Sequence, residues 1–214
     1  MKHLPIILCG LFAIGPARAA VTATTFDLSW SGALAVPDNN ATGASSTVTF
    51  NAPEWNRIQV VTVELRFDGG WNGDLYGYLV HNGTLAILLN RPGRTAANDF
   101  GAGSTSLVAV FSDTAPADVH TALPDSGPAT GIWQPDGRYI DPLLVLDTTP
   151  RTHLLSGFTG MDPNGDWTLF LADQGAGDEA TLTGWTLSIT AVPEPSVGLL
   201  GGLAVLLALR RKRG

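Results

Sequence analysis

The sequence predicts an all-β fold, built as an antiparallel β-sandwich or barrel. Apolar residues alternate with polar ones in many short segments, which is the period of a strand with one buried face. Gly, Pro, Asn and Asp separate these segments throughout the chain, and no stretch of ten or more residues carries a helical apolar stripe. Many short strands with turns between them are typical of sandwiches and barrels.

The predicted strands follow one another at short intervals. We expect them, in chain order, at residues 26–30, 48–50, 58–67, 75–80, 85–89, 107–111, 143–146, 167–172 and 181–190. The third segment alternates most clearly. Its apolar face carries Val61, Val63, Leu65 and Phe67, and its other face carries Ile58, Val60, Thr62, Glu64 and Arg66.

The connections also have readable signatures. Asn82-Gly83 lies between the fourth and fifth predicted strands, and this dipeptide strongly favours a two-residue hairpin loop. The stretch 112–141 is rich in Pro, Asp and Gly, so we expect it to run over the surface.

Residues 1–19 have the organisation of a secretory signal peptide. Lys2 gives the N-terminus a positive charge, residues 4–14 are apolar and uncharged, and Ala17-Arg18-Ala19 supplies small residues at the spacing that signal peptidase requires. We therefore expect export, with cleavage between Ala19 and Ala20. The apolar stretch is shorter than the roughly 20 residues that a transmembrane helix takes.

The segment that follows is acidic and free of cysteine. Cys9 is the only cysteine and lies within the predicted signal peptide, so the exported part forms neither a disulfide nor a thiolate metal site. Residues 20–191 hold six arginines, no lysine and eighteen acidic residues, a formal charge of −12. We expect no nucleic-acid partner, because such binding depends on Lys and Arg at the phosphates.

Two segments share spaced motifs with a known family. Gly70–Gly93 contains Gly73-Asp74-Leu75, then Gly83-Thr84 and the pair Leu88-Leu89. Phe158–Thr190 contains a Gly-x-Trp-x-Leu strand, an aspartate-containing hairpin and a Leu-x-x-Trp-x-Leu strand; the matching positions are Gly165, Trp167, Leu169, Asp173, Asp178, Leu182, Trp185 and Leu187. In this pattern the chain from Val36 to Thr190 resembles the P domain, also called the P/Homo B domain, of proprotein convertases and bacterial secreted proteases.

The resemblance implies a jelly-roll-like antiparallel β-sandwich over residues 20–191. In convertases this domain accompanies a subtilisin-like protease domain and supports its folding and stability. Here the sandwich takes up all of residues 20–191, with no room for a catalytic domain. The segment Phe67-Asp68-Gly69-Gly70 departs from the family, whose members often carry a His-Thr pair at this position.

No residue pattern points to catalysis. The segment after the signal peptide contains three histidines, His81, His120 and His153, and the chain has neither a His-Glu-x-x-His motif nor a Gly-x-Ser-x-Gly nucleophile elbow. The stretch His81-Asn82-Gly83-Thr84 differs from the His-Gly-Thr of subtilases by an inserted Asn, and a hairpin turn accounts for it. We therefore expect a protein that is not an enzyme.

Calcium is the one cofactor that we consider. Some bacterial members of the resembled family bind calcium, and Asp74, Asp173 and Asp178 match family positions in loops. Carboxylate oxygens are the ligands that Ca²⁺ prefers. The same side chains would also serve to close tight turns, and the sequence leaves both alternatives open.

The tryptophans suggest a second kind of ligand. Trp167 and Trp185 occupy strand positions, so we expect them to be buried. Trp55 and Trp71 lie in turn-rich segments, and we consider them as candidates for stacking against a glycan.

The C-terminal segment, residues 192–214, combines three features in order. Val192-Pro193-Glu194-Pro195 precedes an apolar run at residues 196–209, and Arg210, Arg211, Lys212 and Arg213 follow. This order resembles the PEP-CTERM sorting signal of Gram-negative bacteria. The apolar run makes about 21 Å of helix against a bilayer core of about 30 Å, and the basic cluster stops transfer on the cytoplasmic side. We expect a short sorting helix that tethers the protein transiently to the inner membrane.

These features together predict a function. The resemblance implies that an exosortase-type membrane enzyme recognises the Pro-Glu-Pro segment, cleaves near it and passes the sandwich outward. We expect a non-catalytic module at the cell surface or in the extracellular matrix, with a structural or adhesive role and an exopolysaccharide or a surface protein as partner. The alternative is an accessory domain that folds, docks or inhibits a separately encoded subtilisin-like protease.

Overall fold

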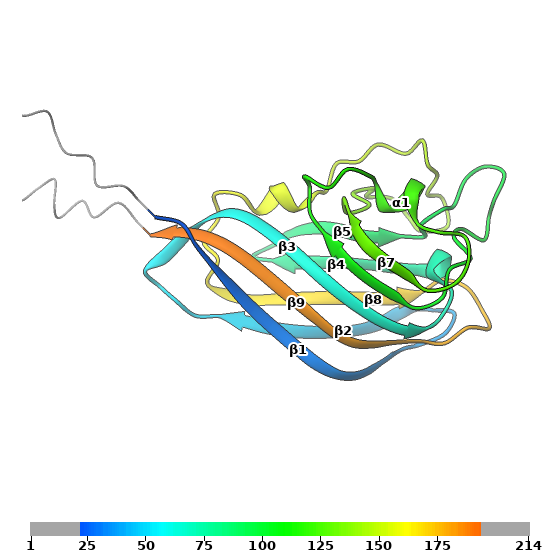
Figure 1. The fold of residues 1–214 in the computed structure, drawn as a ribbon, viewed down its shortest axis with the longest axis horizontal. Coiled ribbons are helices and arrows are strands. Elements are labelled where there is room, and N and C mark those ends of the chain that lie inside the picture. Colours follow the sequence, from blue (N-terminus) through cyan, green and yellow to red (C-terminus); the bar gives the residue numbers. More distant parts are fainter. Residues whose placement is uncertain (1–21, 194–214) are drawn as a thin grey trace, which may run out of the picture.

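The computed structural model describes residues 22–193, which form a sandwich of two β-sheets (Figure 1). Sheet A has five strands in the order β1-β9-β3-β6-β7, and sheet B has four in the order β2-β8-β4-β5. Neighbouring strands are antiparallel except β6 and β7, which are parallel. The predicted all-β sandwich is confirmed. The signal peptide and the sorting helix lie outside the described residues.

The nine strands take up most of the described chain. They are β1 (Thr24–Val36), β2 (Asn40–Phe50), β3 (Trp55–Gly69), β4 (Leu75–His81), β5 (Thr84–Asn90), β6 (Leu107–Phe111), β7 (Ala129–Trp133), β8 (Gly165–Asp173) and β9 (Ala180–Pro193). The helices are single turns, namely η1 (Asn72–Asp74), α1 (Val119–Ala122) and η2 (Leu155–Phe158). Between residues 22 and 193, no helix is long and apolar enough to cross a membrane.

The period-two pattern placed most strands correctly and failed in two places. The predicted strand 143–146 is wrong, because Asp141 closes a turn there and accepts hydrogen bonds from the N–H groups of Leu143 and Leu144. Strand β7 lies inside the stretch that was expected to be an irregular surface excursion. Its sequence, Ala-Thr-Gly-Ile-Trp, lacks apolar alternation, and it pairs only with β6 at the sheet edge.

The core lies between the sheets and is filled by the alternating apolar positions. Val61, Val63, Leu65 and Phe67 of β3 are buried as predicted. Ile58 is buried as well, against the prediction, because the pairing of β3 with β9 shifts register between Ile58 and Val60. A β-bulge of this kind breaks the strict alternation of faces.

The predicted hairpin between β4 and β5 is confirmed. Asn82 and Gly83 have φ angles of 47° and 78°, the left-handed conformation at both central positions that a type I′ turn requires. His81 ends β4 and is buried, with its ring stacked on that of Trp167 at 4.0 Å. Trp167 and Trp185 are both buried, as predicted.

The start of β1 and the end of β9 lie at the same end of the sandwich (Figure 1). Thr24 pairs with Ala191, and Trp55 at the start of β3 pairs with Pro193. We call this the terminal end. The opposite end, the loop end, carries the turns at residues 37–39, 70–74 and 174–179.

Residues 134–154, which we call the strap, lie along the free edge of β5. Asp136 and Gly137 donate backbone N–H groups to the carbonyls of Leu88 and Ile87, and Ile87 in turn donates to the carbonyl of His153. Asn90 of β5 donates from its side chain to the carbonyls of residues 138 and 140. The strap therefore satisfies the edge that sheet B would otherwise expose.

Candidate functional site

Aromatic side chains gather on the outer face of sheet B. Strand β4 alternates between buried and half-buried residues, which turns Leu75, Gly77 and Leu79 inward and leaves Tyr76 and Tyr78 on the outer face. Phe170 is directly opposite Tyr78 on β8 and shares its face. We call the set Tyr76, Tyr78 and Phe170 the aromatic face.

The rings of the aromatic face contact one another across the strands. Tyr78 and Phe170 stack with their centroids 4.8 Å apart and an angle of 19° between the rings. Tyr76 packs edge-on against both, at 5.8 Å from Tyr78 and 6.3 Å from Phe170. Such cross-strand pairs hold each other in fixed rotamers, so the rings form a rigid apolar surface.

The strap borders this surface with a fourth ring. Tyr139 is 59% exposed and stacks on His153 at 4.3 Å. Burial, helped by neighbouring Tyr78, Tyr139, Asp136 and Asp141, raises the pKa of Tyr76 to about 12. The hydroxyl of Tyr76 therefore stays neutral at physiological pH and keeps its proton as a hydrogen-bond donor.

The aromatic face carries no positive charge. Strands β2, β4, β5 and β8 contain neither lysine nor arginine. Besides Phe170, the outer positions of β2 and β8 include hydroxyl groups and one carboxylate: Thr47 bonds to Thr168 at 2.8 Å, and Thr49 donates to Asp166 at 2.6 Å. An anionic polymer would find no counter-charge on this face.

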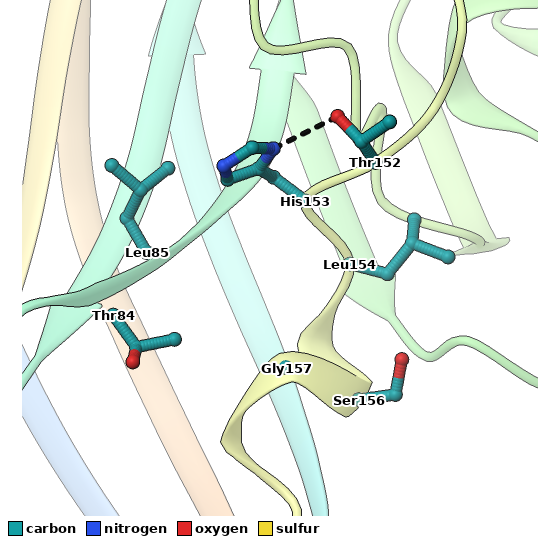
Figure 2. Close-up of a pocket in the computed structure, with 7 residues that line it drawn as sticks. All are labelled: Thr84, Leu85, Thr152, His153, Leu154, Ser156 and Gly157. Atoms are coloured by element: carbon teal, nitrogen blue, oxygen red, sulfur yellow. Dashed lines mark hydrogen bonds between the residues drawn. The ribbon is translucent and has the colours of Figure 1, made fainter.

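A pocket of about 370 Å³ opens between the strap and β5. Figure 2 shows Thr84 and Leu85 on one side and residues 152–154, 156 and 157 on the other, with the hydrogen bond between Thr152 Oγ1 and His153 Nδ1 drawn dashed. Leu85 is opposite Val80, which continues the outer face of β4, and His153 stacks on Tyr139. The pocket therefore lies at the β5 edge of sheet B, beside Tyr139 of the strap.

The acidic residues that the sequence singled out lie at the loop end, where the structure brings Asp74 and Asp173 together. Asp74 is ion-paired with Arg91 at 3.1 Å, and Asp173 pairs with Leu75 across β8 and β4. Burial raises the pKa of Asp74, and the charges of Asp178 and Asp38 raise it further against the lowering effect of Arg91.

Asp173 is the more unusual carboxylate, since only 1% of it is exposed. Its Oδ1 accepts a hydrogen bond from the N–H of Gly175, whereas Oδ2 has no partner within the described residues. Burial raises its pKa to about 6, and the charges of Asp74, Asp38 and Asp178 act in the same direction.

These residues fit a calcium site only in part. The unpartnered Oδ2 of Asp173 is an oxygen that a cation would satisfy, but Arg91 already neutralises Asp74. Within residues 22–193, no three His, Cys, Asp or Glu side chains converge closely enough to hold a metal ion. Calcium binding at the loop end stays a prediction.

The two candidate tryptophans lie at opposite ends of the sandwich, away from the aromatic face. Trp55 is half-buried at the terminal end, where it packs edge-on against Phe26 at 5.2 Å. Trp71 is half-buried at the loop end, and its Nε1–H donates to the carbonyl of Phe100 at 3.0 Å. Trp55 and Trp71 therefore do not form one aromatic surface.

The histidines contact backbone, carboxylate and threonine groups. His120 Nδ1 lies 2.7 Å from Asp136 Oδ2, and its Nε2–H donates to the carbonyl of Arg94 at 2.8 Å. His153 contacts Thr152 but no carboxylate. Within the described part of the chain, no histidine therefore joins a hydroxyl and a carboxylate as in a Ser-His-Asp triad.

The remaining predicted residues concern processing. Val192 and Pro193 are the last residues of β9, where they pair with Arg57 and Trp55. The other processing residues lie outside the described range: Ala19, Ala20, Glu194, Pro195, Arg210, Arg211, Lys212 and Arg213.

The aromatic face escaped the sequence reasoning. The stretch Leu75–Val80 does show tyrosines at alternate positions, and that alternation is the signal that could have placed both on one face. Phe170 is about ninety residues further along the chain, so its position opposite Tyr78 depends on the pairing of β4 with β8.

The comparisons with known proteins are sparse. No protein-family model matches the chain, and no curated protein matches its sequence. A crystal structure of the Aeromonas sobria serine protease in complex with its chaperone is similar over 80% of this chain, with 17% identity and a TM-score of 0.46. A structure of the A. sobria serine protease itself is similar over 81%, with 15% identity and a TM-score of 0.45. This chain spans 27% and 28% of those chains. At such scores the likeness carries no argument about function.

Proposed function

We propose that this chain is an exported, non-catalytic β-sandwich module that binds an uncharged polysaccharide at the cell surface or in the extracellular matrix. The observation that carries the proposal is the aromatic face of sheet B, with Tyr78 and Phe170 stacked across the strands at 4.8 Å. Rigid aromatic rings offer apolar contact area at low entropic cost, and tyrosine adds a hydroxyl donor.

The charge of the aromatic face and its surroundings favours a neutral polysaccharide over an anionic one. With no basic residue on the strands of sheet B, and with Asp166 exposed at its margin, an anionic chain would be repelled. The hydroxyl pairs along β2 and β8 and the polar groups of the pocket suit a ligand rich in hydroxyl groups. Sugar rings have one apolar face and a hydroxyl rim, which matches this combination.

Delivery follows from the two ends of the chain. The predicted signal peptide and sorting segment join the sandwich at the terminal end, where β1 begins and β9 ends. A membrane tether at that end leaves the outer face of sheet B along the side of the domain (Figure 1). The signal peptidase and an exosortase-type enzyme are the processing partners in this proposal.

The test is binding of defined oligosaccharides by isothermal titration calorimetry. We expect at least one of the neutral glucan, galactan and chitin hexasaccharides to bind, and alginate not to bind. Replacing one stacked ring by alanine should weaken binding about 3- to 10-fold, because such a contact is worth about 0.5–1.5 kcal/mol. The variants are Tyr78→Ala and Phe170→Ala.

The matched control is Phe100→Ala, which removes a 75% exposed aromatic ring from a loop outside sheet B. It should leave the affinity unchanged. If none of the three hexasaccharides binds, or if Tyr78→Ala binds as well as the unaltered chain while melting at the same temperature, the proposal is wrong.

A second candidate function, assisting a separately encoded subtilisin-like protease, is favoured by one observation. Leu143 and Leu144 are 58% and 64% exposed next to each other on the strap, although the strap itself is firmly attached. Adjacent exposed leucines on a fixed loop suit a protein partner. Refolding denatured subtilisin with this chain should raise the recovered protease activity, and a Leu143→Ser, Leu144→Ser variant should not. Equal recovery with and without the chain would exclude this function.

A further inference from the structure

The loop end carries an acceptor sequence for asparagine glycosylation. Residues 38–42 read Asp-Asn-Asn-Ala-Thr, so Asn40-Ala41-Thr42 satisfies the Asn-x-Ser/Thr pattern. Asp38 stands two residues before Asn40, and an acidic residue at that distance extends the acceptor motif that bacterial oligosaccharyltransferases use. We propose that Asn40 carries an N-linked oligosaccharide, added after export.

The backbone presents this sequence at the surface. Asn40 pairs with Asp173, and the next pair along is Ala44 with Leu171, so residues 41–43 of β2 lie opposite Ala172 alone. The chain on either side is bent, with positive φ angles of 47° at Asn39 and 59° at Gly43. Asn40, Ala41 and Thr42 are all exposed. The acceptor therefore lies in an exposed bulge of an edge strand, where an enzyme can reach it.

The side chain of Asn40 is oriented for reaction. Its Oδ1 accepts a hydrogen bond from the N–H of Thr42 at 2.9 Å, while its Nδ2 makes no hydrogen bond within the described residues. This short turn leaves the amide nitrogen of Asn40 and the hydroxyl of Thr42 exposed on one segment. Asp38 is exposed too, and it accepts hydrogen bonds from the N–H of Gly177 at the surface.

A second Asn-x-Thr sequence serves as an internal comparison. Asn82-Gly83-Thr84 forms the tight turn between β4 and β5, and the residue two positions before Asn82 is the apolar Val80. The side chain of Asn82 contacts the ring of the preceding residue, His81, with 3.0 Å between Nδ2 and Nε2. We assign modification to Asn40 and not to Asn82.

The transfer balances with a lipid-linked sugar as co-reactant. The Nδ2 of Asn40 attacks the anomeric carbon of an oligosaccharide carried on polyprenyl pyrophosphate, and a C–N bond forms. The C–O bond to the pyrophosphate breaks, and polyprenyl pyrophosphate leaves with the electron pair. Nδ2 gives up one proton to a base of the transferase. No oxidant or reductant is needed.

The test is mass spectrometry of the full chain isolated from the cells that produce it. After proteolysis, the peptide containing Asn40 should carry the mass of an oligosaccharide, and the peptide containing Asn82 should not. The modification should disappear in Asn40→Gln and Thr42→Ala, persist in Thr42→Ser, and fall at least about tenfold in occupancy in Asp38→Ala. The control Asn82→Gln should leave it unchanged.

An Asn40 peptide found unmodified, or a glycan found on Asn82 instead, overturns the assignment. This outcome is separable from the proposed polysaccharide binding, because Asn40 lies at the loop end and the aromatic face on the outer side of sheet B. Asn40→Gln should bind the hexasaccharides as the unaltered chain does, whatever the modification state.

Discussion

At the scale of single residues, the buried carboxylate of Asp173 destabilises the folded protein when it is ionised. Its carboxylate is buried at the loop end, with one oxygen bonded to the N–H of Gly175 and the other without a partner in the described residues. Burying an incompletely paired charge is costly, and the group responds by holding its proton more tightly. That explains why its pKa rises from 3.8 to about 6.

This shift sets the sign of a pH effect. Below about pH 3 the carboxyl is neutral in the folded and unfolded chains, so the group adds no penalty. As pH rises toward 6, the unfolded chain releases the proton first, and folding loses stability until the folded carboxyl ionises as well. One pKa unit corresponds to about 1.4 kcal/mol, so the full penalty above pH 6 is on the order of 2–3 kcal/mol.

We therefore predict that Asp173→Asn stabilises the protein at neutral pH and not in acid. Its gain over the unaltered chain should grow between pH 4 and pH 7, with a rise of roughly 2–4 °C in melting temperature per kcal/mol for a chain of this size. Thermal melts followed by circular dichroism in EDTA measure it. Asp125→Asn, at an exposed position in another loop, is the control. A difference that does not vary with pH would contradict the prediction.

Features of single residues were predictable from the sequence where they depend on one strand or one turn alone. The burial of Trp167 and Trp185 followed from their strand positions, and the turn at Asn82-Gly83 followed from local backbone preferences. The contact between Tyr78 and Phe170 did not follow, because it is created by pairing two strands far apart in the sequence. The ion pair of Asp74 with Arg91 was not predicted either, because it too depends on how separate segments pack together.

At the scale of elements, buried charges hold the strap. Asp136 is fully buried, lies 2.7 Å from His120 and is paired with Arg138 at 3.4 Å. Arg138 also reaches Asp118 at 2.8 Å, which ties the strap to the residue that caps α1. The strap was predicted to be partly strand and partly surface excursion because its sequence lacks periodicity. Its order comes from these charge pairs instead.

We predict that Asp136→Ala destabilises the protein by about 3–5 kcal/mol, since it leaves the buried guanidinium of Arg138 and the buried ring of His120 without this partner. Urea unfolding followed by tryptophan fluorescence measures the loss. Asp99→Ala is the matched control: it breaks the ion pair with Arg94, but the side chain of Asp99 is 79% exposed. Exposed pairs contribute about 0–1 kcal/mol. Similar losses in both variants would show that the buried pairs do not hold the strap.

Calcium binding at the loop end is tested through the stability of the folded protein. If calcium binds there, an excess of Ca²⁺ raises the melting temperature, because a ligand of the folded state stabilises by about 2.7 kcal/mol at one hundred times its Kd. EDTA should reverse the rise, and Asp173→Asn should abolish it. A melting temperature that ignores Ca²⁺ and EDTA would leave Asp74, Asp173 and Asp178 with the turn-closing role alone.

At the scale of the whole molecule, the sandwich places the predicted tether and the proposed ligand surface at different positions. Strands β3 and β9 span the molecule between the terminal end and the loop end. The aromatic face lies between these ends on sheet B, and Asn40 lies at the loop end. A tether at the terminal end would hold the domain with its loops directed away from the membrane. The fold was predictable from the pattern of strands in the sequence. Which features lie at which end of the sandwich was not, because that depends on the order of the strands in the sheets.

The strand order also limits where the sorting segment can be cut. Val192 and Pro193 belong to β9 and pair with β3, so their backbone is held in the sheet and is a poor protease substrate. We therefore predict that processing removes the chain beyond Pro193, leaving all of β9 in the mature protein, and that the N-terminus begins at Ala20. Intact-mass spectrometry of the protein from the extracellular and membrane fractions measures both ends.

Glu194→Ala should retain the C-terminal segment and accumulate in the inner-membrane fraction, whereas Glu54→Ala, at an exposed turn of the terminal end, should be processed normally. An exported chain that still ends at Gly214 would rule out sorting by cleavage.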